Sequence, residues 1–313
     1  ALSLILNFSI RDKTIIVTDS LSKYYAINVE TGKIIWSKNH NTIFISDIKV
    51  DENKFYIIDS NNILHCFLLV DGSKLWEFDS DFELIKSQKK LSIVLDEENV
   101  YFNNSKGDIY SVDKDNGNLI WLTPSRNPNE ISQTFLLKTS ELVTNKDNIY
   151  FSNNQNSFFS IDRKTGFINW QQNINSELKP IIVNNLIFTV STDGYLFVID
   201  QASGNILRIT DLLGVFSTAS KKYNPLYFFD PPEKKAAKRP GFKPVGFELD
   251  VNNIYLSLSN GKILVIDIKN GRTKSILKIS GGKISKPFIQ KDHMFIVKDN
   301  EIMNPAGLRN SKE

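Results

Sequence analysis

The sequence predicts an all-β fold, a β-propeller made of four-stranded antiparallel blades. Two observations lead to this prediction. A short motif recurs six times along the 313 residues, and the segments between its copies alternate apolar and polar residues with a period of two. These segments are rich in β-branched and aromatic residues, as strands prefer, and they end at tight-turn sequences. Helical repeats of similar length would instead space their apolar residues by 3.6.

The recurring motif is a turn followed by a short strand that ends in tryptophan. In Ala26–Trp36 it reads Ala-Ile-Asn-Val-Glu-Thr-Gly-Lys-Ile-Ile-Trp. We expect the glycine to adopt the positive φ that closes a hairpin, and an upstream Asp to accept backbone amides of the turn. Four copies keep glycine and tryptophan, namely Gly32/Trp36, Gly72/Trp76, Gly117/Trp121 and Gly166/Trp170, and two keep only the glycine, Gly204 with Arg208 and Gly271 with Ser275.

The blades are expected to follow one another along the chain. The motif glycines are 40, 45, 49, 38 and 67 residues apart, and propeller blades repeat at roughly 40–50 residues. Each blade begins with its first strand, as in Ile43–Val50 and Phe135–Leu142. The predicted blades are Leu2–Lys38, Ile43–Phe78, Leu91–Leu122, Gln133–Ile174, Pro180–Thr210 and Val245–Ile279, with a partial seventh from Ile284 to Met303.

A single propeller domain is predicted over residues 1–303, followed by a polar tail at 304–313. The partial blade lacks an outer strand, and the first residues already begin a blade. Either the ring closes imperfectly with seven blades, or residues upstream of this chain supply the missing strand and even an eighth blade. We expect the second arrangement, because an unpaired apolar edge strand promotes aggregation.

Residues 211–243 interrupt the repeat. The part from Lys221 to Lys243 contains seven Lys or Arg, five aromatic residues and four prolines, and prolines disfavour regular ladders. An insertion of this length is usually functional or unstructured. Two interpretations remain open, a solvated loop whose aromatic residues fold back on the propeller, and a partner-docking loop that uses Tyr227, Phe228, Phe229, Lys234, Lys235, Lys238 and Arg239.

The residue pattern does not predict a catalytic site. His40, His65 and His293 fall in different repeats, without carboxylates spaced as metal ligands. The acidic run at Asp96 lies at a turn and is interpreted as solvated charge, and Cys66 as a small buried hydrophobe. We therefore expect no catalytic residue, no metal and no cofactor.

Charge and hydropathy exclude two further classes. The net charge of +3, from 38 Lys and Arg against 35 Asp and Glu, gives no general attraction for nucleic acid. No run of about 18 apolar residues is present, so no transmembrane segment is expected.

The repeats at Tyr25–Trp36 and Phe159–Trp170 resemble the tryptophan-docking repeats of the PQQ-like propeller superfamily. In that superfamily the repeat tryptophan docks between adjacent blades. The resemblance therefore implies a structural role for Trp36, Trp76, Trp121 and Trp170, and it leaves the docking of the blades with Arg208 and Ser275 open.

Two branches of the superfamily imply different functions. The quinoprotein dehydrogenases are larger, and their alcohol-oxidising members use an adjacent cysteine pair and calcium-binding acidic residues, whereas this chain has only Cys66. The cofactor-free BamB branch has a similar length and layout. It implies a non-catalytic scaffold in the periplasm that supports outer-membrane β-barrel assembly. Its partner would be a barrel-assembly subunit, and any membrane association would use a lipid anchor outside this chain.

Two alternatives to this function remain open. One is a PQQ-dependent dehydrogenase or a quinone-sensing propeller. The other is a propeller adaptor of another complex that docks through residues 211–243. The first would require quinone binding, and the second predicts that deletion of the insertion abolishes partner binding.

Overall fold

The computed structural model describes residues 5–80, 89–125, 137–216, 240–279, 282–290, 293–299 and 301–305. The regular elements in these ranges are β-strands, apart from one 3-10 turn, η2 at Gly214–Phe216. The chain divides into two compact units, Ala1–Pro180 and Ile181–Glu313. That a single domain spans residues 1–303 therefore remains a prediction.

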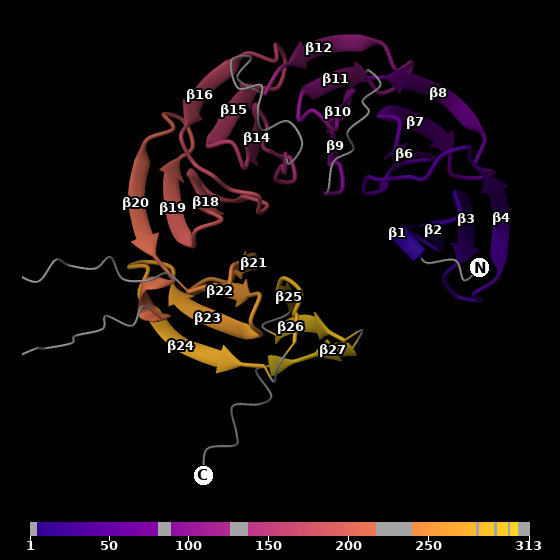
Figure 1. Cartoon of the computed structure of the whole chain (residues 1–313). Helices are drawn as coiled ribbons and strands as arrows, with labels where there is room; N and C mark the ends of the chain where they lie inside the picture. The colour runs from indigo at the N-terminus through magenta and orange to yellow at the C-terminus, as the bar shows by residue number, and fades with distance from the viewer. Residues whose placement is uncertain are drawn as a thin grey trace, which may run out of the picture. The chain divides into compact units, whose positions relative to one another are not determined.

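The first unit contains four sheets, each formed by four consecutive antiparallel strands. Within this unit the sheets follow one another in chain order, and the last strand of each, β4, β8, β12 or β16, lies on the outer side (Figure 1). Blade 1 contains β1 (Ile5–Arg11), β2 (Thr14–Asp19), β3 (Lys23–Asn28) and β4 (Ile34–Asn39); blade 2 contains β5 (Lys49–Asp51), β6 (Lys54–Ile58), β7 (Ile63–Leu68) and β8 (Lys74–Asp79); blade 3 contains β9 (Ile93–Leu95), β10 (Asn99–Asn103), β11 (Ile109–Asp113) and β12 (Leu119–Thr123); blade 4 contains β13 (Val143–Thr144), β14 (Asn148–Asn153), β15 (Ser157–Asp162) and β16 (Ile168–Gln172).

The second unit contains three sheets. Blade 5 contains β17 (Ile181–Val183), β18 (Leu186–Val190), β19 (Tyr195–Asp200) and β20 (Ile206–Asp211); blade 6 contains β21 (Pro244–Leu249), β22 (Asn253–Leu258), β23 (Lys262–Asp267) and β24 (Thr273–Lys278); blade 7 contains β25 (Phe288–Gln290), β26 (His293–Lys298) and β27 (Glu301–Met303). Blade 7 has three strands among the described residues. The predicted fold class, an all-β propeller of four-stranded antiparallel blades, is confirmed.

The hydrophobic core lies between neighbouring blades. The middle strands of a blade are buried along most of their length, as in β6 and β7. One face of blade 2, with Tyr56 and Cys66, packs against blade 3, and the other, with Phe55 and Phe67, packs against blade 1. Burial raises the pKa of the Cys66 thiol to about 12, so this cysteine is an inert core residue.

The first strand of several blades is shorter than predicted. Regular pairing covers Lys49–Asp51 in blade 2 and Val143–Thr144 in blade 4. The predicted start at Ile43 was therefore wrong. The predicted strand Phe135–Leu142 was wrong over 137–142, where Thr139 makes an isolated bridge, and its first two residues lie outside the described residues. A serine side chain replaces the ladder there, because the hydroxyls of Ser46 and Ser140 accept the backbone amides of the adjacent strand at 2.8 and 3.0 Å.

The turns follow the predicted chemistry. In blade 3 the Asp113 carboxylate accepts the amides of Asp115 and Asn116, both at 2.9 Å, and Gly117 has a φ of 74°. Blade 2 has Leu68 where the other blades have Asp or Asn, and Asp71 accepts the Ser73 amide instead. The six motif glycines Gly32, Gly72, Gly117, Gly166, Gly204 and Gly271 all have positive φ.

Candidate functional site

The outer strand of a blade places its tryptophan against the motif turn of the next blade. The indole N–H donates to a main-chain oxygen that lies seven residues before the next tryptophan, in three pairs: Trp36 to Leu69 at 3.0 Å, Trp76 to Lys114 at 3.3 Å and Trp121 to Arg163 at 3.1 Å. The ring covers the turn glycine so closely that a Cβ on Gly117 would lie 2.6 Å from Trp76. Glycine is therefore needed there for space as well as for φ.

Arg208 makes the same connection in the second unit, where the motif lacks tryptophan. Its Nη2 donates to the main-chain oxygen of Ile268 at 2.9 Å, and its Nη1 donates to that of Lys269. Ile268 lies seven residues before Ser275, as the acceptors of the tryptophans do. The planar guanidinium thus replaces the indole donor, which the sequence pattern had left open. Trp170 stacks on Phe158 within blade 4, with ring centroids 5.9 Å apart.

The predicted partner-docking loop cannot be placed. Its residues, Tyr227, Phe228, Phe229, Lys234, Lys235, Lys238 and Arg239, lie outside the described residues. The two ends of the insertion are described and meet, because the ring of Phe216 packs edge-on against Phe242 with centroids 5.0 Å apart. The Lys262 ammonium lies 4.8 Å above the Phe216 ring. The insertion therefore leaves and re-enters the second unit at one place.

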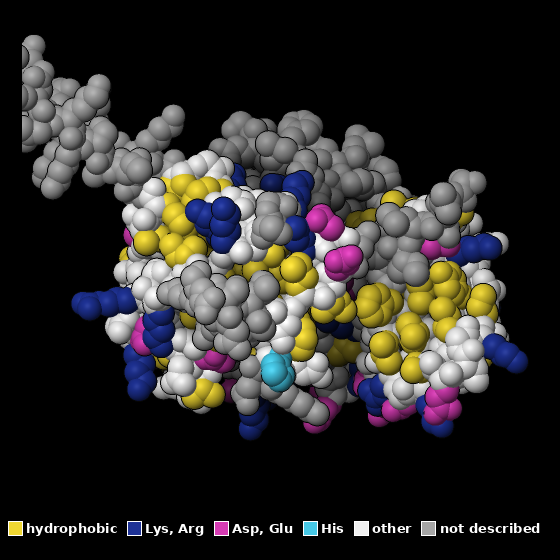
Figure 2. Space-filling model, turned by 90° about the horizontal axis from the view of Figure 1, so that it is seen from below, with side chains coloured by type: hydrophobic (Ala, Val, Ile, Leu, Met, Phe, Trp, Pro, Cys, Tyr) yellow, Lys and Arg dark blue, Asp and Glu magenta, His cyan; other side chains and the backbone are white. Residues whose placement is uncertain are grey.

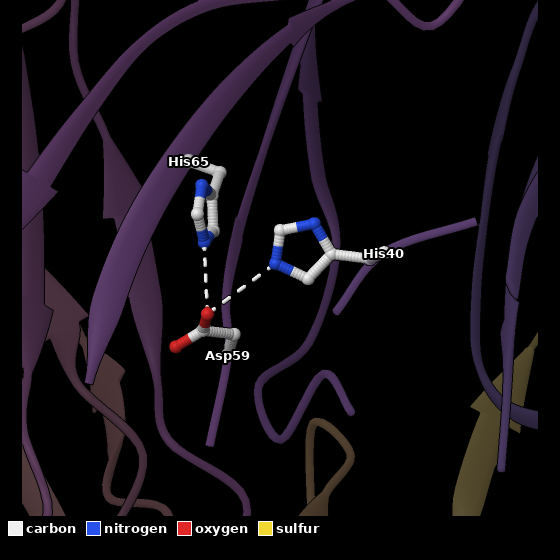
Figure 3. A group of neighbouring side chains, drawn as sticks. All are labelled: His40, Asp59 and His65. Carbon is white, nitrogen blue, oxygen red and sulfur yellow. Dashed lines mark hydrogen bonds and ion pairs between the residues drawn. The ribbon is translucent and has the colours of Figure 1, made fainter. Parts of the chain in front are cut away.

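A cluster that the sequence did not predict lies where blade 1 meets blade 2 (Figure 3). His40 follows β4, Asp59 follows β6, and His65 lies on β7. Both imidazoles direct Nε2 at the same carboxylate oxygen, Asp59 Oδ2, at 3.1 Å from His65 and 3.3 Å from His40. We call these three residues the His–Asp–His cluster.

Asp59 is buried but fully engaged. Its Oδ1 accepts the amides of Asn61 and Ile63 at 2.8 and 3.1 Å, and its Oδ2 also accepts the Thr42 hydroxyl at 2.7 Å. Burial by itself would raise the pKa of Asp59, but the hydrogen bonds from the two imidazoles and Thr42 outweigh it and hold that pKa well below its usual range. At neutral pH this residue is therefore a buried carboxylate anion.

The two histidines differ in exposure. The side chain of His65 is 2% exposed and that of His40 is 17% exposed, so solvent reaches the cluster on the His40 side. His65 Nδ1 is buried without a hydrogen bond in the described structure, and it lies 3.4 Å from Glu77 Oε2. The His40 ring stacks on Phe44 at 4.7 Å, which fixes its orientation.

The cluster occupies three fixed positions of the repeat. His40 lies four residues after Trp36, while Asp59 and His65 lie 17 and 11 residues before Trp76. The sequence pattern placed His40 and His65 in different repeats and so did not predict the cluster. In the structure the end of one blade contacts the hairpin of the next, which brings these residues together. Aligning the repeats on tryptophan and pairing each with its successor would have found the cluster. His293, on β26 in the second unit, is not part of it.

The acidic residue Asp96 is structural and not solvated charge. Its Oδ1 accepts the amides of Glu98 and Asn99, and its Oδ2 accepts the Tyr101 hydroxyl at 2.7 Å. Arg163 of blade 4 reaches the same oxygen at 3.3 Å, and the Asp96 side chain is 14% exposed. The interpretation as solvated charge was wrong for Asp96, since this carboxylate links blades 3 and 4, whereas Glu97 and Glu98 of the same run are exposed.

Comparison with solved structures identifies similar folds. The structure of BamB from Moraxella catarrhalis is similar with a TM-score of 0.74 and 13% identity, covering 96% of this chain and 83% of that chain. The computationally designed Ika8 protein has a TM-score of 0.70 and 12% identity, covering 96% and 82%. The C-terminal WD40 domain of Sif2 has a TM-score of 0.68 and 11% identity, covering 98% and 84%. At these identities the likeness shows the propeller fold alone.

Three further findings concern the sequence and its membrane topology. No curated protein matches the sequence. In the described ranges, no helix has the length and hydropathy needed to cross a bilayer. A family model described as "Outer membrane protein assembly factor BamB" matches residues 4–210, which is more than half of the chain. The tryptophan-docked blades of the first unit and blade 5 lie in this match, and the chain belongs to the BamB family of PQQ-like propellers.

Proposed function

We propose that this chain is a non-catalytic binding scaffold that supports the assembly and insertion of outer-membrane β-barrel proteins through protein–protein contacts. Membership of the BamB family, over residues 4–210, carries the proposal. The partner would be a barrel-assembly subunit of the outer membrane. The location would be the periplasm, with an outer-membrane anchor through a lipid attached outside this chain.

The surface chemistry is consistent with a protein partner. On the face drawn in Figure 2, Lys and Arg side chains lie among Asp and Glu, and hydrophobic side chains gather between them. The outer strands carry large exposed apolar side chains, including Ile34 at 62% on β4 and Leu207 at 60% on β20. Exposed apolar residues on edge strands favour contact with another polypeptide.

The first test is affinity purification of the full-length protein from the membranes of its own cells, followed by mass spectrometry. We expect a subunit that inserts β-barrels into the outer membrane to co-purify, and we expect fractionation to place the protein in the periplasm. Recovery in the cytoplasm, or a monomer that brings down no barrel-assembly subunit, would contradict the proposal.

A second experiment tests whether the docking loop makes the contact. In one variant the basic residues Lys234, Lys235, Lys238 and Arg239 are changed to Glu. A matched control changes four other surface lysines, Lys13, Lys33, Lys146 and Lys164, to Glu. If the loop binds the partner, the first variant loses it and the control keeps it. Retention by the first variant would show that the partner binds elsewhere on the propeller.

A further inference from the structure

We propose that the His–Asp–His cluster binds a divalent transition-metal ion, zinc in the first instance, with His40 Nε2, His65 Nε2 and Asp59 Oδ2 as ligands. The ion would connect the end of blade 1 to the hairpin of blade 2. Neither membership of the BamB family nor the similar structures carry this inference, which rests on the geometry of three side chains.

The spacing of the three ligand atoms suits a zinc ion. Zinc binds imidazole nitrogen and carboxylate oxygen at about 2.0–2.2 Å, so two ligands in a tetrahedral site lie roughly 3.3–3.5 Å apart. Asp59 Oδ2 lies 3.1 Å from His65 Nε2 and 3.3 Å from His40 Nε2, and the three atoms lie within 4.8 Å of one another. Small shifts of the side chains suffice to accommodate the ion.

Hydrogen bonds alone satisfy the cluster poorly. A carboxylate offers about four lone-pair sites. The amides of Asn61 and Ile63 and the hydroxyl of Thr42 take three of them. Both imidazoles then converge on the one that remains, at Asp59 Oδ2. A cation removes this conflict, because it accepts one lone pair from each imidazole and one from the carboxylate.

The far side of the His65 ring lies close to a carboxylate, that of Glu77. A histidine that binds metal through one nitrogen usually donates its other N–H to a carboxylate, which fixes the tautomer. His65 Nδ1 is buried, makes no hydrogen bond in the described structure, and lies 3.4 Å from Glu77 Oε2. With an ion on Nε2, Nδ1 carries the proton and Glu77 is its acceptor.

The ligand set indicates which metal binds. Two imidazoles and one carboxylate suit zinc and its neighbours, whereas calcium and magnesium prefer oxygen ligands. Three protein ligands leave a fourth tetrahedral position, which water would occupy on the partly exposed side near His40. The anionic Asp59, with Glu77 beyond His65, offsets the charge of the ion.

In the next pair of blades, the same repeat positions carry other residues. These are Ser80, Asn104 and Tyr110. There the Asn104 amide and the Tyr110 hydroxyl both donate to the main-chain oxygen of Ser80, at 3.1 and 3.2 Å. Neutral hydrogen bonds thus close a blade-to-blade contact at these positions, so the propeller does not itself require ionisable residues there.

The test is zinc titration of the tag-free, metal-stripped full chain by calorimetry at pH 7.5. We expect one ion per chain with a dissociation constant in the micromolar range or below. Cobalt should give the intense visible absorption of a four-coordinate site. The single changes His40→Ser, Asp59→Asn and His65→Tyr copy the neighbouring contact, and each should weaken binding at least 10-fold.

The matched control is His293→Ala, which removes the remaining histidine and should leave binding unchanged. Circular dichroism checks the fold of each variant, and Asp59→Asn keeps the side-chain oxygen that the amides of Asn61 and Ile63 need. The proposal fails if the wild-type chain binds no zinc at 0.1 mM. It also fails if the folded Asp59→Asn variant binds as tightly as the wild type.

Discussion

The contact of blade 1 with blade 2 and that of blade 2 with blade 3 share a backbone frame but differ in chemistry. In the second contact Asn104 accepts the amides of Lys106 and Asp108, both at 3.0 Å, as Asp59 accepts those of Asn61 and Ile63 in the first. The turn is therefore common to both blades. The second oxygen of Asp59, which meets two imidazoles, is what distinguishes the first contact.

This difference separates what the repeat requires from what it permits. The frame requires a hydrogen-bond acceptor at the hairpin and a docking donor on the outer strand. It permits a charged, ligand-like cluster at one contact and a neutral one at the next. Residues that differ from their counterparts in the other repeats therefore indicate where this protein has a specific property.

The largest expected effect is that of Asp59→Ala compared with Asn104→Ala. Removing Asp59 leaves two amides, a hydroxyl and two imidazoles without their acceptor, which costs about 4 kcal/mol of unfolding free energy, against about 2 kcal/mol for Asn104. Urea unfolding in the presence of EDTA measures both. Equal losses of unfolding free energy would show that the charge of Asp59 adds no stability to the contact of blade 1 with blade 2.

The second effect isolates tryptophan docking from the chemistry of the clusters. Gly117→Ala places a Cβ 2.6 Å from the Trp76 ring at a φ of 74°, whereas Gly32→Ala, at a φ of 67°, meets nothing within 4 Å. We expect a loss of about 3 kcal/mol for Gly117→Ala and about 1 kcal/mol for Gly32→Ala. Similar losses of unfolding free energy for the two variants would mean that backbone strain alone explains why glycine is needed at this position.

The third effect is a pH dependence that only the first contact should show. Because the folded state holds the pKa of Asp59 below its usual range, this group stabilises the protein above the ordinary aspartate pKa of about 3.9, and the stabilisation is lost as pH falls below it. The groups facing Asp59 are the two imidazoles and Thr42, with Glu77 beyond His65.

The measurement compares wild type with Asp59→Asn by urea unfolding from pH 6 to pH 3. The advantage of the wild type should shrink by about 1 kcal/mol toward the acid end, because below a pKa of about 3.9 this carboxyl takes up a proton in the unfolded chain but not in the folded protein. Asn104→Asp places the same carboxyl group in the second contact, without histidines, and should show a smaller change. A pH-independent difference would contradict a depressed pKa.

The smallest expected effect is that of Glu77→Gln on zinc affinity. Loss of the carboxylate beyond His65 should weaken binding about 10-fold without changing the stability of the metal-free protein. Glu77 also pairs with Lys74 at 2.7 Å, so Lys74→Met serves as the control for that ion pair. At the second contact the corresponding residue is Leu122. Equal zinc affinities for wild type and Glu77→Gln would show that the Glu77 carboxylate does not contribute to the metal site.

Most of the fold could be predicted from the sequence because the repeat marks the outer half of each blade. Glycine and tryptophan fix the turn and the outer strand, and alternating apolar residues fix the two middle strands. The first strand was less predictable, because the hydroxyls of Ser46 and Ser140 substitute for ladder bonds, and hydropathy carries no trace of this.

The His–Asp–His cluster was missed for a different reason. Its members come from two repeats, and spacing rules for metal ligands assume residues on one helix or one hairpin. The docking role of Arg208 was left open for a related reason, since the pattern was defined by tryptophan and not by the donated N–H. In both cases the decisive relation is between neighbouring repeats.

The docking tryptophans also give the first unit a direction. Blades 1, 2 and 3 each donate an indole to the next blade, so that blade 2 receives one from Trp36 and donates one from Trp76. When repeats interact mainly with their neighbours, stability behaves as a sum of local and nearest-neighbour contributions. A substitution that disrupts the turn of one blade then also destabilises the outer strand of the preceding blade, because the tryptophan of that strand docks on the turn. Amide exchange should accordingly spread from a damaged turn toward lower residue numbers.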